Sequence, residues 1–133
     1  SVIEKNKDVI KQFNKWKLRQ KTKKINLIKG LWQQQLPFLN KKYDSIFFDD
    51  SPSHEINLNN NDRFYLFLKL LLLKNVKYNT KLVYYATRPL KLIGYLTKHF
   101  KCRSYKYQID IPYYCKYAKG KYMYINEIVF KKV

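Results

Sequence analysis

The sequence predicts an α/β protein with a doubly wound, mostly parallel sheet and an antiparallel strand at one edge. Strand-like and helix-like segments alternate along most of the 133 residues. The early strands are continuous apolar runs, which is typical of strands covered on both faces. Two tyrosine-rich strands follow one another near the end, as expected where an antiparallel strand completes a parallel sheet. The length suits one domain over residues 1–133.

The first half of the chain begins with a short strand followed by an amphipathic helix. Val2–Glu4 is a short apolar run that ends in an acid, and Asn6 is a suitable cap for the helix that follows. Apolar residues at helical spacing then mark the buried side of this helix, namely Val9, Ile10, Phe13 and Trp16. Further elements are expected as strands at residues 25–28 and 45–48 and as a short helical or turn segment at 33–39.

The second half is expected to alternate helices and strands before the final strand pair. Residues 52–61 are polar and predict a loop, whereas residues 62–73 are almost wholly apolar and predict a helix buried against the sheet. A helix is expected at residues 89–99 because proline suits a first helical turn. The expected strands are residues 81–86, residues 104–111 and Tyr122–Phe130.

The charge of the chain is strongly and broadly positive. There are 28 Lys and Arg against 9 Asp and Glu, a net charge of +19, whereas small soluble domains usually carry a magnitude of about 2 to 8. Acids are absent from residues 9–43 and from residues 63–109, so the cations are not confined to a tail. This pattern favours an anionic partner such as RNA. The alternative is a solvated surface produced by an AT-rich coding bias.

Metal binding, disulfide bonding and membrane spanning are not predicted. The cysteines and histidines do not occur at ligand spacing, and we expect reduced thiols in an intracellular protein. These residues are Cys102, Cys115, His54 and His99. The longest apolar run, residues 70–73, is far short of the roughly 20 residues that cross a bilayer.

An ordered series of short matches resembles the guanidinoacetate N-methyltransferase family. Lys29-Gly30-Leu31-Trp32 and Tyr43-Asp44-Ser45-Ile46-Phe47-Phe48-Asp49 occur at the family's spacing, after a similar start around Glu4. The resemblance is specific over about the first 55 residues and continues more weakly to the C-terminus. It implies a class I methyltransferase fold and S-adenosylmethionine as the ancestral cofactor.

The resemblance also implies roles for particular residues. Glu4 matches the acid that accepts hydrogen bonds from the cofactor ribose, and Gly30, Leu31 and Trp32 match the segment that lines the adenine. Asp49 matches the catalytic aspartate that pairs with the guanidino group and faces the methyl donor. The structural alternatives are a surface acid at Glu4, a core residue at Trp32 and a cap at Asp49.

Two features of the family are missing from these residues. The family's first strand and its glycine-rich cofactor turn would precede Ser1, and Asn59, Asn60 and Asn61 replace the histidines of its substrate loop. In the family fold the first strand lies in the middle of the sheet, so its loss would leave unpaired backbone groups. We therefore expect either a longer chain or a second polypeptide that supplies this strand.

Two functions follow. The favoured one is a methyltransferase-fold subunit, non-catalytic on its own, that offers a basic surface to RNA in a larger assembly such as an organellar ribonucleoprotein. Location in the mitochondrion or another organelle is expected with it. The alternative is an S-adenosylmethionine-dependent N-methyltransferase that acts on guanidinoacetate or arginine.

Overall fold

The structure is a computed structural model that describes residues 1–21, 24–49, 60–86, 88–110 and 122–131. The chain forms two compact units, Ser1–Asn40 and Lys41–Val133. Each unit has its own sheet with helices, which places the protein in the α/β class as predicted. Among the described residues, no helix is long and apolar enough to span a membrane.

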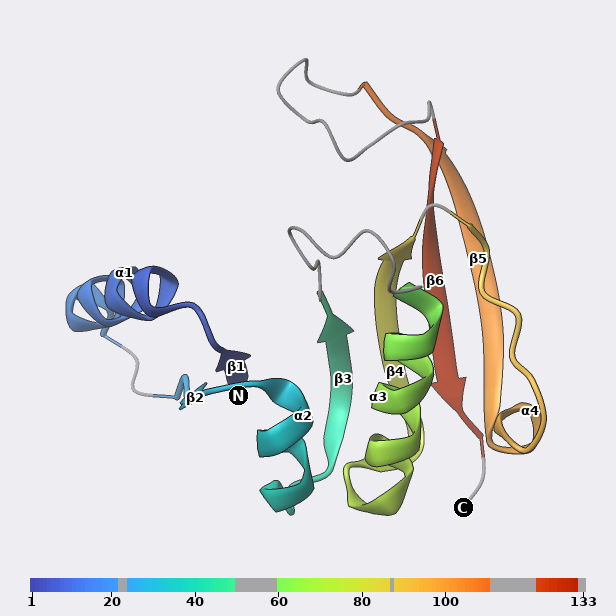
Figure 1. Cartoon of the computed structure of the whole chain (residues 1–133), viewed down its shortest axis with the longest axis horizontal. Helices are drawn as coiled ribbons and strands as arrows, with labels where there is room; N and C mark the ends of the chain where they lie inside the picture. The colour runs from blue at the N-terminus through green and yellow to red at the C-terminus, as the bar shows by residue number, and fades with distance from the viewer. Residues whose placement is uncertain (22–23, 50–59, 87, 111–121, 132–133) are drawn as a thin grey trace. The chain divides into compact units, whose positions relative to one another are not determined.

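The first unit is built on two short parallel strands joined by a helix (Figure 1). Its elements are β1 (Val2–Glu4), α1 (Lys7–Arg19), β2 (Leu27–Lys29), α2 (Trp32–Gln35) and the 3-10 turn η1 (Leu36–Phe38). The predicted cap is confirmed, because Oδ1 of Asn6 accepts the N–H groups of Asp8 at 2.9 Å and Val9 at 3.2 Å. The parallel pairing of the first two predicted strands is confirmed as well.

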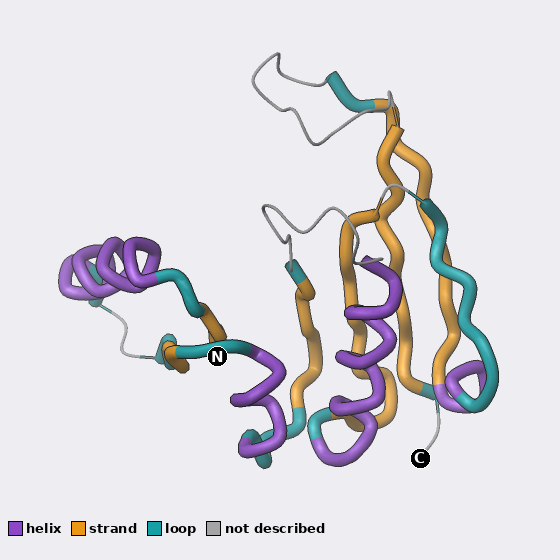
Figure 2. Tube along the Cα trace, viewed as in Figure 1, coloured by secondary structure: helices purple, strands orange, loops and turns teal. Residues whose placement is uncertain are grey.

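The second unit is built on a four-stranded mixed sheet. Its strands are among those drawn orange in Figure 2. Its elements are β3 (Tyr43–Phe48), α3 (Asn60–Lys74), β4 (Val76–Ala86), α4 (Leu96–His99), β5 (Phe100–Gln108) and β6 (Tyr122–Phe130). The strand order is β3-β4-β6-β5. β3 and β4 are parallel, and β6 is antiparallel to both β4 and β5.

The prediction of an antiparallel strand at the edge is wrong, because β6 lies inside the sheet and β5 forms the edge. The side chains explain this order. Asn126, Ile128 and Phe130 of β6 are buried, as expected of a strand with a neighbour on each side. β5 instead carries Lys101 and Arg103, and charged side chains are tolerated on an edge strand and discourage further pairing there.

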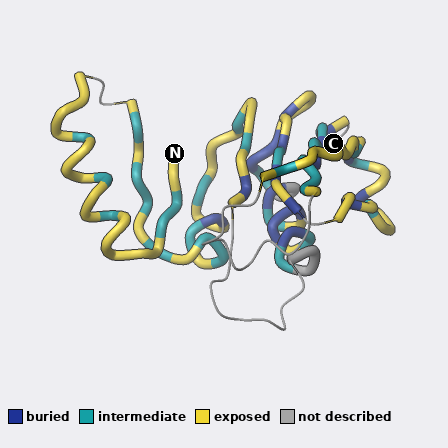
Figure 3. Tube along the Cα trace, turned by 90° about the horizontal axis from the view of Figure 1, so that it is seen from above, coloured by how far each residue is buried: buried dark blue, intermediate teal, exposed yellow. Residues whose placement is uncertain are grey.

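The core of the second unit lies between α3 and one face of the sheet. Phe64 of α3 stacks on Tyr84 of β4, with ring centroids 4.0 Å apart and planes 17° from parallel. Phe67 of α3 packs on Phe48 of β3 at 4.4 Å. Figure 3 shows buried stretches on α3 and on the strands against which it packs. Each buried Phe contributes about 1.5 to 3 kcal/mol, so this aromatic layer is a main source of stability. The predicted helix over residues 62–73 is confirmed.

The predicted helix over residues 89–99 is wrong apart from its last turn, α4. Residues 88–95 are irregular because their backbone groups bond elsewhere in the unit. The N–H of Leu90 donates to Oδ1 of Asn126 at 3.1 Å, and the carbonyl of Lys91 accepts the hydroxyl of Tyr65. Gly94 has a φ of +57°, outside the helical range. The carbonyl of Lys91 is thus engaged outside a helix, and the positive φ of Gly94 interrupts the helix that Pro89 in the first turn predicted.

Several boundaries also differ from the predictions. β4 begins at Val76, and β5 begins at Phe100 rather than at residue 104. The earlier start of β4 includes an irregular pairing with β3, where the hydroxyl of Thr80 donates to the carbonyl of Tyr43 at 2.6 Å. The hydroxyl of Thr80 thus takes the place of the backbone N–H that would bond this carbonyl in a regular strand pair. The predicted loop at 52–61 lies outside the described residues up to residue 59.

Candidate functional site

The residues expected to contact the cofactor lie together at the carboxyl ends of β1 and β2. Glu4 is the last residue of β1 and is in register with Lys29, the last residue of β2. Gly30 follows at once, and its N–H donates to the carbonyl of Glu4 at 2.9 Å. Leu31 and Trp32 then enter α2. The carboxyl ends of parallel strands are where α/β sheets bind ligands.

The Glu4 carboxylate is oriented by the start of α1. Its Oε1 accepts the backbone N–H of Asn6 at 2.8 Å, and Asn6 in turn caps the helix. The side chain is half-buried. A carboxylate has about four acceptor positions, so this single bond leaves capacity for two hydroxyl donors such as those of a ribose.

Gly30 occupies a backbone conformation that favours glycine. Its φ is +133°, and a Cβ placed there would lie 2.9 Å from Nε2 of Gln35. Any side chain would therefore strain the backbone and displace Gln35. The sharp turn carries the chain from β2 to Leu31, which is 38% exposed, and to the half-buried indole of Trp32. An apolar side chain and an aromatic ring offer the flat surface that a purine requires.

Asp49 lies in the second unit, immediately after β3, and its side chain is exposed. The preceding residue, Phe48, pairs with Tyr84 near the end of the parallel strand β4. Asp49 therefore stands at the carboxyl end of a pair of parallel strands, as the family resemblance implies. The other predicted site residues, Glu4 and Gly30 to Trp32, belong to the first unit.

A buried polar network beside β4 was not predicted from the sequence. Oδ1 of the fully buried Asn126 accepts the hydroxyl of Ser104 at 2.5 Å as well as the N–H of Leu90, and its Nδ2 donates to the carbonyl of Arg88 at 3.3 Å. Burial raises the pKa of the neighbouring Tyr84 to about 12. The sequence feature that could have indicated this network is Asn126, the one asparagine among the mainly apolar residues of β6. Its role is to hold residues 88–90 against the sheet.

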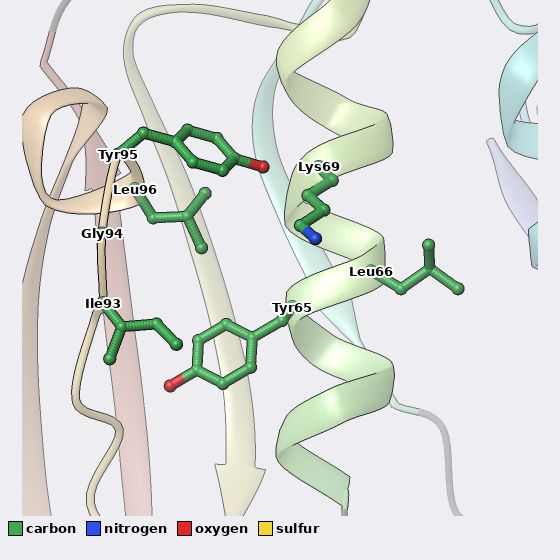
Figure 4. Close-up of a pocket in the computed structure, with 7 residues that line it drawn as sticks. All are labelled: Tyr65, Leu66, Lys69, Ile93, Gly94, Tyr95 and Leu96. Atoms are coloured by element: carbon green, nitrogen blue, oxygen red, sulfur yellow. The ribbon is translucent and has the colours of Figure 1, made fainter.

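A hollow of about 430 Å³ opens between α3 and the segment that leads into α4. Figure 4 shows Tyr65 and Lys69 on α3 facing Ile93, Tyr95 and Leu96 across it. None of the seven described residues that line it carries a carboxylate. The ammonium of Lys69 would repel a guanidinium ion, so this hollow does not suit the family's substrate.

The second unit also contains one thiol that the structure describes and one exposed ion pair. Sγ of Cys102 is unbonded to another sulfur and donates to the carbonyl of Leu90 at 3.6 Å, and burial raises the pKa of this thiol. The Lys77 ammonium bonds the Asp44 carboxylate and lowers the pKa of that carboxyl. Cys115 lies outside the described residues. Cys102 belongs to β5 and Asp44 to β3, and neither is one of the predicted cofactor residues.

Comparison with known proteins supports the resemblance noted in the sequence. No curated protein matches the chain. A sequence model of the guanidinoacetate N-methyltransferase family matches residues 1–89. This stretch runs from β1 to the end of β4 and includes Glu4, the Gly30 turn and Asp49. The match covers more than half of the 133 residues, and the chain belongs to the guanidinoacetate N-methyltransferase family.

Proposed function

We propose that this protein is a methyltransferase-fold subunit that binds RNA through a basic surface and is not catalytic on its own. The observation that carries the proposal is the net charge of +19 on 133 residues. A guanidino substrate is cationic or zwitterionic and gains nothing from such a field, whereas phosphates are attracted by it. A ribonucleoprotein of the mitochondrion or another organelle is the kind of assembly that fits.

The distribution of cations in the second unit supports this proposal. From residue 63 to residue 109 the sequence has no acid, and this stretch holds most of α3, β4, α4 and β5. Exposed cations of these elements and their connections include Lys69, Lys81, Arg88, Lys91, Lys98, Lys101, Arg103 and Lys106. Cations spread over several elements neutralise phosphates without reading a base sequence.

Unpaired strand edges support a protein partner within the same assembly. Among the described residues, β1 pairs only with β2, and β3 pairs only with β4. Each of these strands therefore has one edge whose N–H and C=O groups need partners. We propose that another polypeptide supplies a strand that pairs with one of these edges.

An S-adenosylmethionine-dependent N-methyltransferase is the second candidate, favoured by the cluster at the ends of β1 and β2. Glu4 would hold the ribose of the cofactor, and Leu31 and Trp32 would hold its adenine. The cofactor, when bound, supplies the methyl group. Asp49 would pair with the guanidino group and accept its proton.

One experiment with the purified protein separates the two candidates. We expect Asp49→Asn to leave binding of a single-stranded RNA unchanged, because removing one exposed acid does not weaken attraction for phosphate. In the same preparations, methyl transfer from labelled S-adenosylmethionine to guanidinoacetate or arginine should be undetectable before and after the change. Turnover by the unaltered protein that disappears in Asp49→Asn, without RNA binding, would establish the enzyme instead.

A further inference from the structure

We propose that the sheet face opposite α3 is a platform on which bases of single-stranded RNA stack. This inference rests on the proposed RNA-binding function and assigns it to a particular surface. The surface, called here the aromatic face, consists of Phe47, Val83, Tyr85, Ile125, Tyr105 and Tyr107, with Lys81, Lys101 and Arg103 beside them. It lies wholly within the second unit.

Strand register places these residues on one face. Cross-strand partners in register share a face, and so do alternate residues along a strand. Tyr85 pairs with Ile125, which pairs with Tyr105 on the far side. Phe47 contacts Tyr85 edge to face, with ring centroids 5.6 Å apart. Tyr84 and Phe48, one residue away on the same strands, are the partners of α3 on the opposite face.

The rings of the aromatic face are accessible. Phe47 is 55% exposed, Tyr85 50%, Tyr107 48% and Tyr105 41%, whereas Tyr84 on the other face is 3% exposed. A half-exposed ring on a rigid strand presents a flat surface at a small entropic cost. Tyr105 and Tyr107 are two residues apart on β5, a spacing of about 6.6 Å. Successive unstacked bases could be accommodated at that spacing.

Cations on the same face are aligned with the rings. On β5 the face reads Lys101, Arg103, Tyr105 and Tyr107, and on the parallel strand β4 it reads Lys81, Val83 and Tyr85. Each row begins with positive charge and ends in an aromatic ring. This order suits a strand whose phosphates lie over the cations while its bases lie over the rings. Glu127, in register with Arg103, is the acid of the face among the described residues.

The combination favours single-stranded RNA over the other macromolecules that bind sheets. A duplex keeps its bases stacked internally and offers no free base to a ring. A protein partner would fit the apolar residues, but lysines are depleted from protein interfaces, and this face holds Lys81 and Lys101. Rings together with cations are the combination that nonspecific single-strand binders use.

A matched pair of double variants tests the assignment. Tyr105→Ala with Arg103→Gln removes one ring and one cation from the aromatic face. Tyr122→Ala with Lys106→Gln removes the same two groups from the opposite face, where Tyr122 is 46% exposed and Lys106 lies 4.2 Å from its ring centroid. Fluorescence anisotropy with a labelled oligouridylate measures the affinity of each purified protein.

We expect the aromatic-face variant to lose about thirtyfold in affinity, since a base stack and a phosphate contact both disappear. The control should lose about threefold or less, and Tyr105→Phe should bind within about twofold because the ring remains. Circular dichroism checks that each variant is folded. If the alanine variant does not fold, ultraviolet crosslinking of a thiouridine oligonucleotide to the unaltered protein is expected to label Tyr105 or Tyr107.

The outcomes separate this inference from the proposed function. Equal losses in both double variants, or crosslinks confined to other surfaces, would overturn the aromatic face while leaving RNA binding intact. Failure of the unaltered protein to bind the oligonucleotide at about 50 mM salt would overturn both. Unchanged RNA affinity in the aromatic-face variant, together with loss of a co-purifying protein, would assign the face to protein docking and refute the platform.

Discussion

The two units of the chain differ in how much apolar surface each buries for itself. Among the described residues of the first unit, Leu36 is the one buried hydrophobic residue. The helix α1 has no buried residue. The apolar side of α1 is accessible to solvent, and Trp16 on it is 44% exposed. The second unit buries a layer of aromatic and aliphatic residues between α3 and its sheet. The predicted cofactor residues therefore stand on the unit with the smaller core, and the proposed RNA surface stands on the better packed one.

The largest effect expected from this difference is on stability. Phe64→Ala should lower the free energy of unfolding by about 3 to 5 kcal/mol, because Phe64 is fully buried and stacks on Tyr84. Phe13→Ala in α1 should cost about 1 kcal/mol or less, because Phe13 is half-buried and its ring contact is with Trp16 of the same helix. Urea denaturation of the purified protein measures both.

A large loss of unfolding free energy in Phe13→Ala would contradict the difference between the two units. A cost above about 2 kcal/mol would mean that the apolar side of α1 is buried in the protein as it exists. A small loss for Phe64→Ala would mean instead that the aromatic layer is not the main core.

A smaller effect follows from the buried hydroxyl of Tyr84. Because burial raises the pKa of this group from 10.0 to about 12 in the folded protein, the unfolded chain loses the proton first as the pH rises. Stability should therefore fall between about pH 10 and pH 12, by about 1 to 2 kcal/mol after allowance for solvent screening. In Tyr84→Phe this loss should disappear against the shared alkaline background. Unfolding curves with identical pH dependence in both proteins would contradict burial of the hydroxyl.

Local patterns predicted most of the elements, and the family resemblance predicted the cluster in the first unit. Asn6 as a cap and the Gly30 turn depend on neighbouring residues, so the local sequence contains the whole signal. The helix expected at 89–99 failed because the side chains of Asn126 and Tyr65, distant in sequence, take its backbone bonds. The prediction that the antiparallel strand lies at the edge of the sheet failed for a related reason. The order of strands in a sheet depends on which strand has a neighbour on each side. The fact that two strands are consecutive in the sequence does not reveal this.

The candidate site was predictable only in part for the same physical reason. The resemblance named Glu4, Gly30, Leu31 and Trp32, and the parallel pairing of β1 with β2 brings them together. The aromatic face required the register of all four strands of the second unit, which places Phe47, Tyr85 and Tyr105 on one side. A high tyrosine content predicts strands, but it does not predict on which face of the sheet the rings lie.

The proposed function of this protein is to bind RNA through its basic surface in a larger assembly. Its most direct test is sedimentation of the native protein from gently lysed source cells, with and without ribonuclease. We predict that the protein sediments in a large particle at low salt and shifts to slow fractions after ribonuclease or at high salt, since phosphate contacts weaken steeply with salt. Sedimentation that is unaffected by ribonuclease, in fractions that transfer methyl groups to a guanidino compound, would contradict the account.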